Sequence, residues 1–219
     1  MDRGGFGNVD NAEHESAFAR KTRQLLDEHG DVFLQIAKGS IEQGLEQKTP
    51  LNLALETLPP VMAEEGACFV TLNKTGRLRG CIGSPEAYRP LATDVASNAF
   101  RSAFKDPRFA PLKTDETDAL DIHLSVLSPK EPFLFESQDD LIDKLLVGTD
   151  GLIIEDNGRR ALFLPSVWKQ LPDPRKFLIH LKNKAGLGAD HWSDTFKGWR
   201  FIAAETGARW NDIPTHGNH

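Results

Sequence analysis

The sequence has very little cysteine and no long apolar run, and both shortages limit what the protein can be. Cys68 and Cys81 are the only cysteines among 219 residues. Residues 1–5 contain no apolar stretch of the kind that a secretory signal needs. Two cysteines without such a signal are typical of reduced thiols, so we expect a cytoplasmic protein. All apolar runs are shorter than the roughly 18 residues that suggest a membrane-spanning helix, so we expect no membrane contact.

Signals for metals and for phosphate loops are also missing. The seven histidines do not follow the spacing of a zinc site. Gly76, Gly80 and Gly83 fit neither of the two common phosphate-loop patterns. We therefore predict no metal site and no bound cofactor. A bulge and close backbone contacts explain these glycines better.

Basic side chains are concentrated in one segment of an otherwise acidic chain. The formal net charge of −6 makes nucleic acid an unlikely partner for the whole surface, because phosphate contacts dominate that affinity. Residues 71–113, however, contain eight cations and only three anions. Such a segment suits an anionic group on a small ligand or the end of a nucleic acid. Solvated surface charge is the alternative interpretation.

Apolar periodicity and capping residues predict several helices. Residues 1–12 are rich in Gly and Asn and are expected to be disordered. A helical extension is predicted over residues 13–30 and ends at Gly30, and a second helix begins at Asp31. Further helices are expected after Pro90, Ser137 and Asp173. Residues 206–219 are expected to form a tail, so that the domain itself covers residues 31–205.

Strands are predicted mainly as hairpins, with helices between them. Residues 67–72 pair with residues 77–82, and residues 152–154 pair with residues 161–164. Single strands are predicted over residues 121–127 and 199–204. This order indicates an α+β fold, in which helices flank an antiparallel or mixed sheet.

The register of the first hairpin decides where the two cysteines point. A type I turn followed by a glycine bulge pairs Asn73 with Arg77. This register sends Cys68 to the apolar face and Cys81 to the face of Arg79, so it predicts that the cysteines form no disulfide. A slip of one residue would instead set Cys68 opposite Cys81 and place the arginines among apolar residues.

Seven segments, taken in order, resemble one protein family. Their sequences are FVTL at 69–72, GRLRGCIG at 76–83, AFKDPRF at 103–109, SVLS at 125–128, DGLII at 150–154, FLPSVW at 163–168 and KAGL at 184–187. The series resembles the AMMECR-type domain family over residues 31–205, and its most specific segment is LRGCIG.

The resemblance implies an α+β fold with a larger and a smaller subdomain. It also implies association with a Memo-like protein and a radical-SAM protein. Lys182 stands where the family often has a cysteine, so the resemblance gives no support for a two-cysteine mechanism here. The helix predicted over residues 13–30 extends beyond the family core.

Cys81 is the residue that has the chemistry of a nucleophile. Cations favour the reactive thiolate, and Arg77 and Arg79 lie on its predicted face. A ligand-pocket wall and simple packing are the alternatives. His123 and Ser125 share one strand face and could complete a Cys–His pair, although a strand histidine is more often a satisfied polar residue.

Arg79 and Arg108 can each bind a carboxylate or a phosphate through two hydrogen bonds. We expect both to converge with Cys81 and Asp106 on one solvent-reachable concavity. Gly80 and Gly83 would line the ligand site beside them. The alternative is a structural Asp106–Arg lock that fixes the loop after the preceding helix.

Three functions from different classes follow from these features, and whether the chain is an enzyme stays open. The first is a pocket protein or enzyme subunit that handles an anionic small molecule or nucleotide in a radical-SAM-linked modification pathway. The second is a non-catalytic adaptor whose basic motif face binds a partner protein. The third is nucleic-acid binding through the basic segment. We favour the first.

Overall fold

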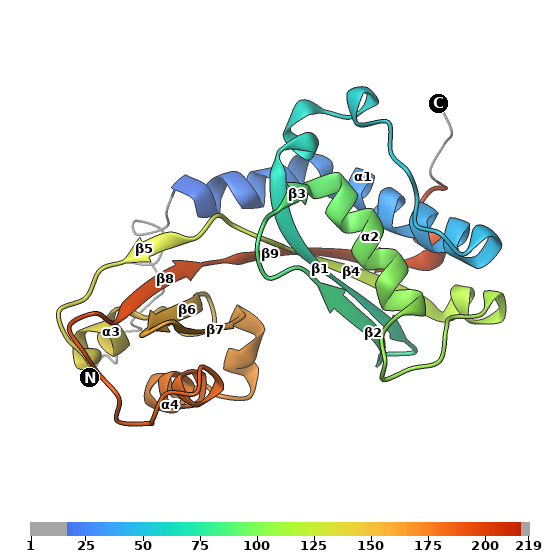
Figure 1. Cartoon of the computed structure of the whole chain (residues 1–219). Coiled ribbons are helices and arrows are strands. Elements are labelled where there is room, and N and C mark those ends of the chain that lie inside the picture. The colour runs from blue at the N-terminus through green and yellow to red at the C-terminus, as the bar shows by residue number, and fades with distance from the viewer. Residues whose placement is uncertain (1–16, 216–219) are drawn as a thin grey trace, which may run out of the picture.

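The computed structural model describes residues 17–215 and contains two antiparallel sheets, each with its own helices (Figure 1). The predicted α+β fold with a larger and a smaller subdomain is confirmed. The disorder expected for residues 1–12 lies outside the described residues. None of the described helices is long and apolar enough to cross a bilayer.

The larger subdomain is a sheet whose main strands lie in the order β2-β1-β4-β9. These strands are β1 (Glu65–Lys74), β2 (Arg77–Gly83), β4 (Leu120–Leu127) and β9 (Ala203–Arg209), and β3 (Arg89–Pro90) pairs with β1. The helices are α1 (Ala17–Gln47) and α2 (Leu91–Phe104). Short 3-10 helices complete the subdomain: η1 (Leu55–Thr57), η2 (Pro60–Ala63), η3 (Thr114–Ala119) and η5 (Trp210–Asp212).

The core of the larger subdomain lies on one face of its sheet, between the strands and the two long helices. Alternation along β1 sends Cys68, Val70 and Leu72 into this core, where all three are fully buried. α1 and α2 pack on the same face. The opposite face therefore has neither long helix on it and is turned toward the smaller subdomain.

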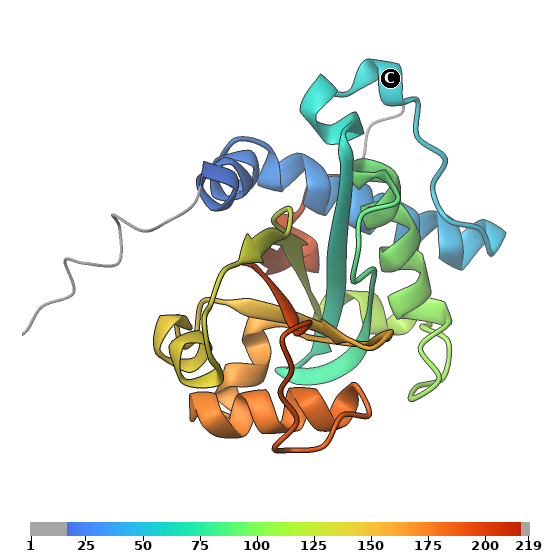
Figure 2. The same cartoon turned by 60° about the vertical axis from the view of Figure 1, so that its left-hand side comes forward.

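The smaller subdomain is a second sheet, in the order β5-β8-β6-β7, with its own core. Its elements are β5 (Glu131–Phe133), α3 (Gln138–Lys144), β6 (Gly151–Asp156), β7 (Arg159–Phe163), η4 (Pro165–Lys169), α4 (Pro174–Lys184) and β8 (Lys197–Phe201). Ser137 and Asp173 cap α3 and α4 with side-chain oxygens, as predicted. Figure 2 shows α4 on the side of this sheet away from α1.

Two crossing segments join the subdomains, and they are hydrogen-bonded to each other. Ser128 follows β4, and Ile202 lies between β8 and β9. The Ser128 N–H donates to the Ile202 carbonyl at 2.9 Å, and the Ile202 N–H donates to the Ser128 hydroxyl at 3.0 Å. These two hydrogen bonds between the crossing segments fix where the two sheets meet.

The prediction that Gly30 ends a helix is wrong, because α1 runs through it without interruption. Gly30 is buried against β9, where an added Cβ would lie 3.4 Å from the Thr206 hydroxyl. Its small size therefore serves close packing between α1 and the sheet. Sequence periodicity alone does not separate this use of glycine from a helix end.

The first hairpin has the predicted strands but a different turn. Both predicted hairpins are antiparallel. Thr75 and Gly76 have positive φ and form a two-residue turn that pairs Lys74 with Arg77, and Arg79 is left unpaired as a bulge. The bulge restores the expected faces beyond it. Both cysteines are free thiols.

The sheet extends further toward the C-terminus than the expected tail allows. The predicted last strand is divided at Ile202, and β9 pairs with β4 as far as Arg209. Trp210 and Ile213 are then buried, and the Lys38 ammonium donates to both of their carbonyls. Apolar burial and these two bonds fix residues that carry little strand pattern of their own.

Candidate functional site

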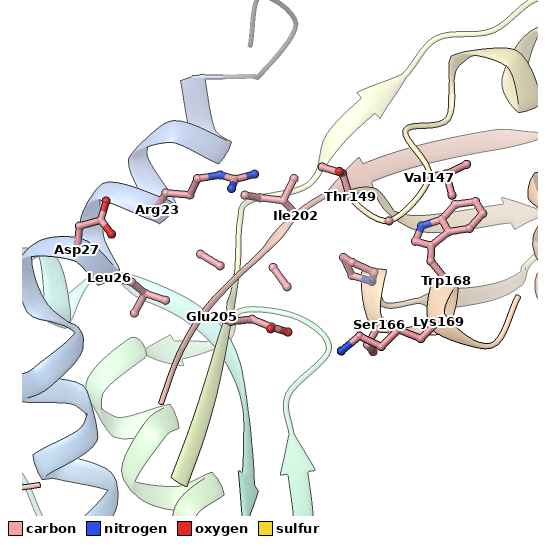
Figure 3. Close-up of a pocket in the computed structure, with 14 residues that line it drawn as sticks. Arg23, Leu26, Asp27, Val147, Thr149, Ser166, Trp168, Lys169, Ile202 and Glu205 are labelled. Atoms are coloured by element: carbon pink, nitrogen blue, oxygen red, sulfur yellow. The ribbon is translucent and has the colours of Figure 1, made fainter. Parts of the chain in front are cut away.

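A cleft lies between the exposed face of the larger sheet and η4 of the smaller subdomain. One cavity, of about 710 Å³, is lined by α1, residues 147–149, η4 and the start of β9 (Figure 3). A second, of about 680 Å³, lies over the sheet face. They are parts of one cleft, because the same five residues line both: Pro165, Ser166, Lys169, Ala203 and Glu205.

The Cys81 thiol lies on the floor of the second cavity. Thr71 is its partner on β1, and His123 is the partner of Thr71 on β4, so the three form one row across the sheet. The Thr71 hydroxyl donates to the sulfur at 3.2 Å. Cys81 is partly exposed, whereas Cys68 is fully buried on the other face. A reagent in the cleft would therefore meet Cys81 first.

His123 does not form the Cys–His pair that the sequence suggested. Two strand spacings, about 9–10 Å, separate its backbone from that of Cys81. Its ring lies over Gly207, where an added Cβ would be 2.6 Å from Nδ1. Within residues 17–215 no hydrogen bond joins this imidazole to the thiol. The histidine is a wall of the cavity.

The next row of the floor contains Gly83, Phe69, Ser125 and Glu205. The Phe69 ring lies over Gly83, where an added Cβ would be 2.2 Å from the ring. The Ser125 hydroxyl donates to the Glu205 carboxylate at 3.3 Å. The absence of a side chain at Gly83 therefore leaves room for the Phe69 ring on the cavity floor.

Asp106 and Arg108 hold the backbone of Cys81. β2 is an edge strand, and the Cys81 N–H donates to Asp106 at 2.9 Å while Arg108 donates to the Cys81 carbonyl at 3.1 Å. Arg108 also binds Asp106 at 2.6 and 2.9 Å. The hydrogen bond from the Arg108 side chain has the largest effect on the Asp106 carboxylate. Together with the backbone hydrogen bonds from Cys81 and Arg108, it keeps the pKa of Asp106 far below its usual range. The pair covers the edge of β2 and fixes Cys81 in place.

Arg79 is engaged elsewhere. Its guanidinium donates to Glu116 at 3.0 and 3.1 Å and to the Ala110 carbonyl at 2.9 Å. Lys74 binds the same carboxylate at 2.9 Å. The hydrogen bonds from Arg79, followed by those from Lys74 and the Lys113 backbone, lower the pKa of Glu116 to about 2. Arg79 therefore fastens the bulge to η3.

The structure thus gathers the predicted site residues around the same strand, but their side chains have different tasks. Of Arg79, Cys81, Asp106 and Arg108, Cys81 alone lines either part of the cleft. Gly80 packs so closely on α2 that an added Cβ would lie 2.1 Å from the Ser102 carbonyl oxygen.

Sequence reasoning missed Lys169 and Glu205 as residues of the cleft. Lys169 follows the FLPSVW segment on η4, and Glu205 lies at the limit of the predicted domain on β9. The segment FLPSVW marks this region as part of the family resemblance, but no local feature of the sequence indicates that it faces β2. In the part of the chain that the structure describes, no three His, Cys, Asp or Glu side chains gather at metal-binding distance.

Replacing Glu116 by Gln should lower stability at neutral pH and matter less in acid. The folded pKa of Glu116 lies below its ordinary value of 4.5. Its ion pairs therefore stabilise the fold fully above pH 4.5, and this stabilisation is lost as the pH falls toward 2. We expect a loss of about 1.5–3 kcal/mol at pH 7. Urea unfolding at pH 7, 5 and 3.5 measures it.

The control for this test is Glu56→Gln, which changes an exposed carboxylate that has no ion pair among the described residues. Its unfolding midpoint should stay within error of the parent at each pH. An E116Q deficit that is equal at pH 7 and pH 3.5 would contradict the ion-pair explanation.

Comparisons with known proteins agree with this fold and place the chain in a family. A protein of Methanothermobacter thermautotrophicus is 40% identical over 175 residues, which cover 80% of this chain and 91% of that protein. A protein of Methanocaldococcus jannaschii is 37% identical over 185 residues, covering 83% and 90%. A crystal structure from Pyrococcus horikoshii matches with a TM-score of 0.72 at 34% identity, covering 85% of this chain and 95% of that one.

The AMMECR1 family model matches residues 34–206. This range takes in the smaller sheet, the larger sheet up to the middle of β9, and the two charged residues that the cavities share, Lys169 and Glu205. It begins inside α1, so the first half of that helix lies outside the match. The chain belongs to the AMMECR1 family.

Proposed function

We propose that the protein binds a small molecule in the cleft, in contact with the Cys81 thiol. The observation that carries the proposal is the position of that thiol, which opens into a cavity while its backbone is held by Asp106 and Arg108. Both cavities fall in the usual size range for ligand sites, about 300–1,000 Å³. The lining mixes apolar side chains such as Phe69 and Leu164 with polar ones such as Thr71 and Ser125, which suits a ligand held in one orientation.

Lys169 is the cation that would bind an anionic group of this ligand. It lines both cavities and is exposed, and within residues 17–215 its ammonium has no ion pair. The arginines that first suggested an anionic ligand are occupied by Glu116 and Asp106. The argument for an anionic group on the ligand therefore depends on Lys169 of η4 and no longer on the arginines of the basic segment.

Cys81 would act as a nucleophile or as a reversible covalent contact. Such a role requires the thiolate, fixed in place and reachable by the ligand. The clamp on its backbone supplies the fixed position, and the hydrogen bond from Thr71 orients the sulfur. If Cys81 is catalytic, the ligand leaves the cleft chemically changed. If Cys81 only contacts the ligand, the ligand leaves unchanged.

Alkylation by iodoacetamide tests whether the cleft gives access to Cys81. We expect rapid modification of Cys81 in the folded protein and none of Cys68, because Cys68 is fully buried and burial raises its pKa. Mass spectrometry of the digested protein locates the adduct. Cys81→Ser should remove the adduct and leave the unfolding midpoint nearly unchanged.

An unreactive Cys81 in folded protein, or equal labelling of both cysteines, would contradict the proposed site. Untargeted mass spectrometry of small molecules that copurify with gently isolated protein then identifies the ligand. The same extraction from Cys81→Ser protein shows whether retention depends on the thiol.

Family resemblance supports a place for this ligand in a radical-SAM-linked modification pathway, beside a Memo-like protein. Coexpression with these two proteins from one microbe tests it. If the pathway is right, a small molecule retained by this chain should appear or change mass only when the radical-SAM protein is present. Identical extracts with and without that protein would argue against the link.

A partner-binding role is the second candidate, and charges outside the cleft favour it. Arg77, Arg101 and Lys105 are exposed, and none of their side chains has an ion pair within residues 17–215. Leu78, beside Arg77, is 44% exposed. Cations next to an exposed leucine suit an acidic protein surface. Such binding would survive Cys81→Ser and would be lost on reversing the charge of Arg77 and Lys105.

A further inference from the structure

Two opposite charges face each other where the two parts of the cleft meet. Lys169 comes from η4 of the smaller subdomain and Glu205 from β9 of the larger one. Figure 3 shows the Lys169 ammonium and the Glu205 carboxylate pointing toward one another across the cleft. Both side chains line both cavities. A ligand at this junction would pass between them.

These two charges differ from Arg79 and Arg108 because no residue of opposite charge is paired with them among residues 17–215. Among the described residues Lys169 has no ion pair, and Glu205 accepts one hydrogen bond, from Ser125. Arg79 and Arg108, in contrast, are bound by carboxylates at 3.0 and 2.6 Å. Lys169 and Glu205 are therefore available to a ligand, one as a donor and the other as an acceptor.

The wider lining also mixes both signs of charge. Arg23 and Asp27 lie one helical turn apart on α1 and form the far wall of the first cavity. A purely anionic ligand would gain from Lys169 but would meet the carboxylates of Glu205 and Asp27. A purely cationic ligand would gain from those carboxylates but would meet the cations Lys169 and Arg23. Like charges brought together in this way cost binding energy, so neither kind of ligand matches the lining.

We infer that the ligand of this cleft is zwitterionic, as an amino acid or the end of a peptide is. Its anionic group meets Lys169, and its ammonium or guanidinium group meets Glu205. The inference rests on the proposed function, since it names the class of ligand that the Cys81 cleft takes. It makes Lys169 and Glu205 the residues that determine specificity.

Four matched alkylating reagents test the charge preference without knowledge of the natural ligand. They are Nε-iodoacetyl-lysine, which is zwitterionic, its Nα-acetyl derivative, which is anionic, its carboxamide, which is cationic, and the doubly blocked neutral form. In each, the Cys81 thiolate attacks the iodoacetyl carbon, a C–S bond forms and iodide leaves. The lysine chain carries the charged end from β2 toward β9. Each rate constant is divided by the rate with free glutathione.

We expect the zwitterionic reagent to modify Cys81 fastest, ahead of the neutral form by roughly fivefold, the effect of one favourable exposed ion pair. Lys169→Gln should remove the advantage that the carboxylate gives. Glu205→Gln should remove the advantage that the amine gives. The matched control is Lys176→Gln, which changes an exposed lysine of α4 outside both cavities and should leave the ranking intact.

The possible results separate this inference from the proposed function. If the anionic reagent is as fast as the zwitterionic one, or if the two variants leave the ranking unchanged, the inference is wrong while the cleft stands. If even the neutral reagent and iodoacetamide leave Cys81 unmodified, both proposals fall.

Discussion

Gly80→Ala is expected to be the most destabilising single substitution near the site. An added Cβ would lie 2.1 Å from the carbonyl oxygen of Ser102 and 3.0 Å from its carbonyl carbon. Both are backbone atoms of α2, so no side-chain rotation relieves the clash. The strand would have to move away from the helix, and the buried contacts of β2 with α2 would be lost. We expect a loss on the order of 3 kcal/mol or more in the free energy of unfolding.

Urea unfolding monitored by circular dichroism measures this loss. The matched control is Gly188→Ala, because a Cβ there meets nothing within 4 Å and the backbone is not in the left-handed region. This variant should unfold at the same urea concentration as the parent, within error. A G80A protein as stable as G188A would show that β2 and α2 are less closely packed than described.

The helices and hairpins could be predicted because local signals determine them. Ser137 and Asp173 place an oxygen at the start of α3 and α4, and Pro90 precedes the first turn of α2. Alternation along β1 assigns Cys68 to the core, whichever turn follows it. These features depend on residues within a few positions of each other, so the sequence displays them directly.

Features that depend on distant contacts could not be predicted in this way. Local sequence predicts a helix end at Gly30, since the residue that requires its small size, Thr206, lies in the last strand. The basic segment predicts a ligand for Arg79, since its actual partner, Glu116, lies beyond the end of that segment at Lys113.

The cleft also depends on contacts between residues that are distant in the sequence. It forms where β1, β2, β4 and β9 meet η4, and these elements are spread over most of the chain. Alternation on β4 did place His123 and Ser125 on one face. It could not show that Glu205 lies beside Ser125 or that Lys169 lies opposite. Only the pairing of β4 with β9, and the crossing at Ile202, bring these groups together.

Asp106→Ala should destabilise the protein by about 2–3 kcal/mol, the scale of charged hydrogen bonds that are lost. The Asp106 side chain is 2% exposed, and its removal leaves the Cys81 N–H on the edge of β2 without an acceptor. Arg108 loses its carboxylate but is half exposed, so water replaces part of that bond. This partial replacement keeps the expected loss below that for a fully buried ion pair.

The pH dependence and the behaviour of Cys81 distinguish this clamp from general packing. The folded pKa of Asp106 lies below its ordinary value of 3.8, so the stabilisation is complete above that pH and declines in stronger acid. The difference between parent and D106A should therefore shrink below pH 4. Hydrogen exchange at the Cys81 amide should also become faster in D106A. Asp118→Ala, which removes an exposed carboxylate of η3 that has no ion pair in the described chain, should change neither property. Unchanged exchange at Cys81 in D106A would mean that β2 holds the thiol in place without the clamp, and that Asp106 only fixes the loop after α2.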